Sequence, residues 1–163
     1  PRTLIFKESL NINFEKEKID SGIGIYYYDQ HKNKWNYLST NYDNDMYSTS
    51  ILSNETFALI EEKNAPIITN LIPDINATYR RQDIEKLTFN IEDELSGISD
   101  IKNILIKIDE EPILFEYNSY RKQVSYSFQD KLIKGIHSLE IQAKDNVGNT
   151  TLIKGNFTIK WKI

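Results

Sequence analysis

Short runs in which apolar and polar residues alternate cover most of the chain, and this periodicity restricts the fold more than any other feature. A half-buried strand turns successive side chains to opposite faces of a sheet, whereas an amphipathic helix spaces its apolar residues three and four apart. The alternation is cleanest over residues 137–143. A parallel α/β fold would need crossover helices between its strands, and the chain shows no segment with that spacing. The pattern therefore predicts an all-β protein.

The predicted strands fall into two groups. In the first 64 residues they cover 10–14, 23–28, 35–38 and 56–60, with polar loops at 29–34 and 41–45. In the remainder they cover 67–72, 87–91, 104–108, 112–117, 124–128, 137–143 and 151–159. About seven short strands within roughly 95 residues are typical of an immunoglobulin-like β-sandwich.

A polar segment, 61–66, separates the two groups and contains Pro66. Proline biases the preceding residue toward extended conformations, which suits a linker. We therefore expect two tandem antiparallel β-sandwich domains, a small one over residues 1–64 and an immunoglobulin-like one over residues 65–163. The first domain is open to interpretation as N-terminally truncated, because an apolar run begins as early as Leu4.

Composition excludes several classes of protein. The 163 residues carry a net charge of −4 and have a pI near 5.3, which disfavours nucleic acid as a partner. The longest uncharged stretch, 64–73, is about half of what a membrane-spanning helix needs, so no membrane insertion is expected. The absence of cysteine excludes a disulfide scaffold, thiol catalysis and Cys-ligated zinc.

Catalytic patterns are missing from the sequence. The two histidines, His31 and His137, lack the spacing of a zinc peptidase, and neither a nucleophile elbow nor a phosphate-binding loop is present. We expect no cofactor and no catalytic residue within these 163 residues. His137 stands at the start of a predicted strand, and a structural role at a sandwich corner is the favoured interpretation.

Two sets of residues are candidates for binding. Glu92 and Asp93 follow one strand and Asp145 follows another, so clustered carboxylates could hold calcium if their turns share one end of the sandwich. Turn-capping by Asp93 and Asp145 would explain the same residues without a metal.

Tyrosines form the second set. Tyr26 and Tyr28 share a strand face, and three others surround a predicted hairpin: Tyr117, Tyr120 and Tyr126. Flat aromatic rings with polar tips suit sugars and protein interfaces, although packing in the core or at a sheet edge explains them equally.

Three spaced motifs carry a resemblance to a known family. They are the turn 93–98 (DELSGI), the strand start 134–139 (KGIHSL) and the turn 143–149 (AKDNVGN). Residues 65–160 resemble the bacterial immunoglobulin-like, or fibronectin type III-like, modules that occur in tandem on secreted and surface proteins. The first half is similar to a β-sandwich that precedes such modules at the C-terminal end of lysostaphin-like cell-wall metallopeptidases and related surface proteins.

The resemblance implies a non-catalytic accessory or spacer region of a bacterial secreted or cell-surface protein, with neighbouring domains of that protein as partners. One alternative is an adhesion module that binds cell-wall glycan or another surface protein. A further alternative is the accessory part of a cell-wall peptidase whose catalytic domain lies outside these residues.

Overall fold

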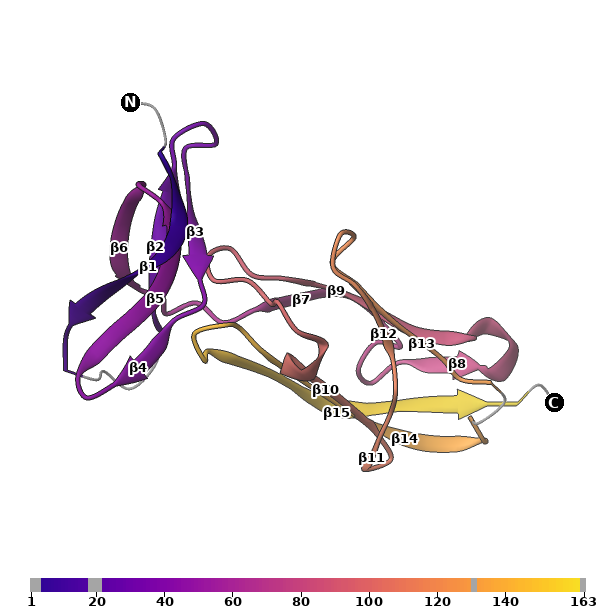
Figure 1. The fold of residues 1–163 in the computed structure, drawn as a ribbon. Helices are drawn as coiled ribbons and strands as arrows, with labels where there is room; N and C mark the ends of the chain where they lie inside the picture. Colours follow the sequence, from indigo (N-terminus) through magenta and orange to yellow (C-terminus); the bar gives the residue numbers. More distant parts are fainter. Residues whose placement is uncertain (1–3, 18–21, 130–131, 162–163) are drawn as a thin grey trace. The chain divides into compact units, whose positions relative to one another are not determined.

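The computed structural model describes residues 4–17, 22–129 and 132–161, and within them the chain is all-β, as predicted (Figure 1). Helical structure in the described residues is limited to two 3₁₀ turns, η1 (Arg81–Asp83) and η2 (Ile101–Asn103). The chain forms two compact units. The first contains Pro1–Asn64 together with Glu94–Gly97 and Asn146–Asn149, and the second contains Ala65–Asp93, Ile98–Asp145 and Thr150–Ile163.

The first unit contains two three-stranded antiparallel sheets. One has the order β1-β5-β4 and the other β3-β2-β6. Their bounds are β1 (Ile5–Glu15), β2 (Ile23–Asp29), β3 (Lys34–Leu38), β4 (Asn41–Asp43), β5 (Met46–Ser53) and β6 (Thr56–Glu61). Both sheets contribute to one core, in which Ile23 and Ile25 of β2 pack with Tyr47 of β5.

Two strands of this unit depart from the sequence prediction. The region 41–45 was expected to be a loop, but Asn41–Asp43 forms β4 and only Asn44 and Asp45 make the turn, both with positive φ. Such a two-residue turn matches the twist of the strands that it joins. Strand β5 was missed because serine and threonine occupy half of its positions and hide the alternation of Tyr47, Thr49 and Ile51, which are buried.

The second unit contains a five-stranded sheet, β11-β10-β14-β15-β8, and a four-stranded sheet, β12-β13-β9-β7. The strands are β7 (Ile67–Ile72), β8 (Thr78–Arg80), β9 (Lys86–Glu92), β10 (Ile104–Ile108), β11 (Glu111–Pro112), β12 (Glu116–Asn118), β13 (Gln123–Ser127), β14 (Gly135–Lys144) and β15 (Thr150–Lys160). Fully buried residues of both sheets, among them Phe89, Ile106 and Ile141, share one core.

The second unit corrects the predicted strand pattern in two respects. Its described residues form nine strands rather than about seven, because the run 112–117 is divided between β11 and β12 and because β8 was not predicted. The sheet containing β8 is mixed rather than purely antiparallel, since β8 pairs in parallel with β15. Strand β8 is only three residues long, too short to show a period.

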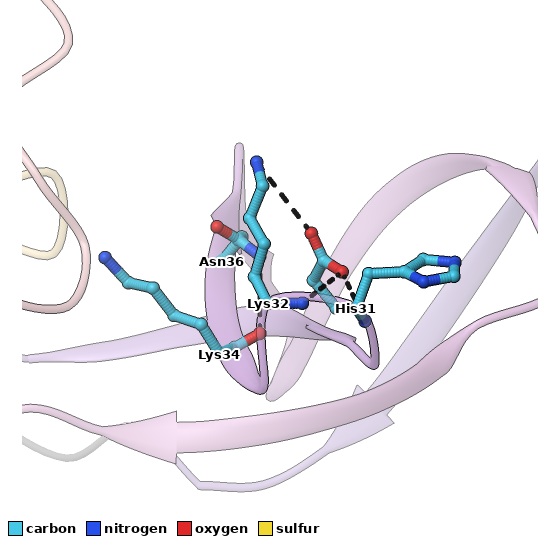
Figure 2. A network of polar contacts seen from close by, with 5 residues as sticks. His31, Lys32, Lys34 and Asn36 are labelled. Carbon is cyan, nitrogen blue, oxygen red and sulfur yellow. Dashed lines mark hydrogen bonds and ion pairs between the residues drawn. The ribbon is translucent and has the colours of Figure 1, made fainter.

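The predicted loop at 29–34 is the turn of the β2–β3 hairpin. The Oδ1 atom of Asp29 accepts the backbone N–H groups of His31 (2.9 Å) and Lys32 (3.1 Å), and Lys32 Nζ lies 3.9 Å from Oδ2 (Figure 2). The Asn36 amide donates to the carbonyl of Lys34 at 3.3 Å. These polar side chains therefore stabilise the turn itself, as aspartate commonly does in short loops.

Candidate functional site

The carboxylates proposed from sequence as calcium ligands do not all come together. Glu92 is exposed at the end of β9, where its Oε2 lies 3.6 Å from Lys122 Nζ. Asp93 and Asp145 do approach each other within the second unit, with one oxygen of each within 4.8 Å of the other. Of the three calcium ligands expected from the sequence, the structure therefore brings Asp93 and Asp145 together and leaves Glu92 outside that pair.

A buried carboxylate that the sequence did not single out, Glu62, organises the first unit. Its side chain is buried at the end of β6, and Oε2 accepts hydrogen bonds from the Ser96 N–H at 3.1 Å and from the Tyr26 hydroxyl at 3.3 Å. Its backbone N–H donates to Gly22, and its carbonyl accepts from the Asn149 amide at 3.1 Å. All three stretches of chain in this unit therefore meet at one residue.

Asn146 extends this network within the first unit. Its side-chain amide donates to the carbonyl of Ser96 at 2.8 Å, and its backbone N–H donates to the carbonyl of Gly97 at 3.0 Å. Its own carbonyl accepts the Tyr37 hydroxyl at 3.3 Å. Stretches 94–97 and 146–149 are thus bonded to each other and to the sheet β3-β2-β6.

Gly22, just before β2, and Gly24, within β2, allow the chain segments of the first unit to approach this sheet closely. A Cβ on Gly22, which has a φ of +80°, would lie 2.0 Å from the carbonyl oxygen of Glu62. A Cβ on Gly24 would lie 2.7 Å from Tyr37 Cε2 and 2.9 Å from Val147 Cγ1. All three distances are shorter than real Cβ contacts, so a larger residue at either position would force Glu62, Tyr37 or Val147 to shift.

The histidines have separate local roles. His31 lies exposed in the β2–β3 turn, within the first unit. His137 is buried in the second unit, and its two ring nitrogens face the Asp109 carboxylate and the Ile133 carbonyl, which confirms the predicted structural role.

The candidate tyrosines differ in burial, and Tyr117 and Tyr120 line one depression on the second unit. Tyr26 is fully buried, whereas Tyr28 is half-buried beside Trp35, with ring centroids 5.1 Å apart. Tyr117 and Tyr126 pack against the core of the second unit.

Tyr120 alone among these tyrosines is almost fully exposed, in the turn between β12 and β13. Tyr117, at the other end of this segment, is partly buried, and this burial raises the pKa of its hydroxyl.

The outer face of the five-stranded sheet carries an ion-pair row. Glu140 lies between Lys154 (2.7 Å) and Lys107 (3.7 Å), and the three residues line a shallow open depression. The hydrogen bond from Lys154 is the main cause that lowers the pKa of Glu140, and the same bond raises the pKa of Lys154. Glu140 and Lys154 therefore stabilise each other's charged forms.

No protein-family model matches the chain, and no curated protein is similar to it in sequence. The described residues contain no helix with the length and apolar character that a membrane crossing requires.

Proposed function

We propose that this chain is a non-catalytic accessory region, a spacer, of a larger bacterial secreted or cell-surface protein, where it positions or docks neighbouring domains. The proposal takes both units as β-sandwiches and the second as immunoglobulin-like. It is supported by the two sheets that share one core in each unit, and by the motifs at 93–98, 134–139 and 143–149. Fold alone does not determine function, so the proposal depends on how the polar groups are used.

One observation carries the proposal: the buried polar side chains hold backbone segments together. Glu62 bonds stretch 94–97, Thr49 donates to the Ser39 carbonyl at 2.8 Å, and His137 bonds the backbone at Ile133. Within the described residues, every buried side-chain nitrogen and oxygen has a hydrogen-bond partner. A catalytic site usually contains polar groups that are left to interact with the substrate, whereas the buried polar groups of this chain stabilise its fold.

The spacer proposal is tested by exposing the purified chain to cell-wall material. We expect no soluble fragments to be released from purified peptidoglycan, and no saturable change in tryptophan fluorescence on titration with soluble peptidoglycan fragments. Release of fragments would overturn the non-catalytic assignment. Saturable binding without release would replace the spacer by an adhesion module.

The adhesion alternative has one observation in its favour. Tyr28 and Trp35 lie side by side on β2 and β3, inclined at 57°, and both rings are half-buried. The only other tryptophan is Trp161, so a Trp161→Phe variant reports on this ring pair alone. A saturable signal in that variant that disappears after Tyr28→Ala would place glycan binding on this face, and an unchanged signal at all glycan concentrations would reject it.

A further inference from the structure

His137 is placed so that both of its ring nitrogens face hydrogen-bond acceptors. It lies near the start of β14 and is 3% exposed. Its Nδ1 is 2.7 Å from Oδ2 of Asp109, and its Nε2 is 2.9 Å from the carbonyl oxygen of Ile133. Asp109 belongs to the turn between β10 and β11, so the ring joins that turn to β14.

This geometry determines how many protons the pair holds. A carbonyl oxygen can only accept, so Nε2 must carry a proton to bond Ile133. An unprotonated Nδ1 opposite an ionised carboxylate would bring two lone pairs to hydrogen-bond distance. A second proton is therefore required between Nδ1 and Asp109, whose other oxygen accepts the Ser138 N–H at 2.9 Å.

The surroundings of the ring favour its charged form. Phe157 of β15 stacks on the imidazole at a centroid distance of 5.4 Å and an angle of 26°, within the range in which an aromatic face attracts a cation. Burial opposes the charge, but the Asp109 side chain is 51% exposed and leaves the negative end of the pair in water.

Among the described residues, the charged side chain that contacts the His137 ring is that of Asp109. Glu140 lies on β14 at a position that points to the opposite face of the strand. The remaining charged groups of the neighbouring elements form no hydrogen bond or ion pair with the ring: Lys107, Glu110, Glu111, Lys134, Lys154 and Lys160.

We propose that Asp109 and His137 form a proton-linked latch that ties the β10–β11 turn to β14. With both ring nitrogens protonated the latch is closed. When the proton shared with Asp109 leaves, the two side chains repel and their contact opens, while the bond from the Asp109 N–H to the Ser138 carbonyl (3.1 Å) still holds the backbone of the turn to β14. Histidines in an unfolded chain lose this proton near pH 6.5. The folded unit then binds more protons than the unfolded chain above that pH, so its stability decreases as the pH rises.

The protonation state can be observed directly by nitrogen-15 NMR of the imidazole rings in the intact chain. His31, exposed in the β2–β3 turn, is the internal control. At about pH 7.5 we expect both nitrogens of His137 to show protonated shifts, with the His31 ring as the reference spectrum. A bare Nδ1 in His137 at this pH would overturn the proposal.

An Asp109→Asn variant separates a proton latch from a merely structural contact. The asparagine carbonyl can still accept the Ser138 N–H, while its amide donates to a neutral Nδ1 of His137. We expect the urea midpoint of the native chain to fall between about pH 6 and pH 9, and this fall to be absent in Asp109→Asn but present in His31→Gln. The same fall in all three proteins would refute the latch, and the NMR result decides the question if the variant does not fold.

Discussion

Replacing Gly24 by alanine tests whether residues 146–149 are an integral part of the first unit. The added methyl group would lie 2.7 Å from the Tyr37 ring and 2.9 Å from Val147 Cγ1. Gly24 has no positive φ, so the substitution introduces no backbone strain and its effect comes from these two contacts. Overpacking of a closed site costs about 1–3 kcal/mol.

Alanine also reduces the entropy of the unfolded chain, which stabilises by about 0.4–1 kcal/mol. Taking the middle of each range, the net expectation for Gly24→Ala is a loss of about 1.3 kcal/mol in the free energy of unfolding. Equilibrium urea unfolding, followed by tryptophan fluorescence, measures this as a midpoint lowered by about 0.5–1 M, given a slope of about 2 kcal/mol per molar.

The double variant with Val147→Ala identifies the contact responsible. Removing the valine methyl groups frees one side of the site, so Gly24→Ala should cost less in the Val147→Ala background than in the native chain. A coupling energy of at least about 0.5 kcal/mol is expected for residues in direct contact. Additive effects, or a Gly24→Ala variant as stable as the native chain, would refute the proposed packing of 146–149 on β2.

Two further predictions concern the second unit. Ile106→Ala, in the core, should lower the free energy of unfolding, measured in urea, by about 2–5 kcal/mol. Leu105→Ala, on the exposed face, should change it by less than about 1 kcal/mol. Equal costs would contradict the assigned faces of β10. The hydrogen bond from Lys154 lowers the pKa of Glu140, so this ion pair contributes stability above the ordinary carboxyl range and loses it as the pH falls. Glu140→Gln should therefore lose less stability than the native chain from about pH 6 to about pH 3, and an unchanged acid dependence would exclude this pair as a source of it.

Local periodicity predicted most of the strands because burial on one face imposes it. The run 104–108 coincides with β10, and 67–72 coincides with β7. Strands without that signature were missed: β5 uses serine and threonine at many positions, and β8 is three residues long. Pairing partners, including the parallel pairing of β8 with β15, depend on contacts between distant residues and leave no local pattern.

The polar network of the first unit could not be predicted from the sequence either, because it also depends on contacts between distant residues. Glu62 stands in a polar segment, 61–66, that has the composition of a solvated linker, and it is distinguished from Glu61 by contacts with distant residues, Tyr26 and Ser96. Gly24 lies in a strand-like run, and the side chains that a Cβ there would meet, Tyr37 and Val147, are distant in sequence. The sequence made a cluster of Glu92, Asp93 and Asp145 conditional on their turns sharing one end of the sandwich. The structure brings Asp93 and Asp145 together, whereas the side chain of Glu92, the last residue of β9, lies beside Lys122.

The central claim is that the buried polar groups of this chain serve its architecture, and hydrogen exchange of the intact protein tests it most directly. The N–H groups of Gly22, Glu62, Ser96 and Asn146 all donate within the first unit. We predict that their exchange is slowed to the same extent as that of amides in β2 and β6, and far more than that of exposed amides in the turn 30–33. Exchange of Ser96 and Asn146 as fast as in that turn would contradict the account.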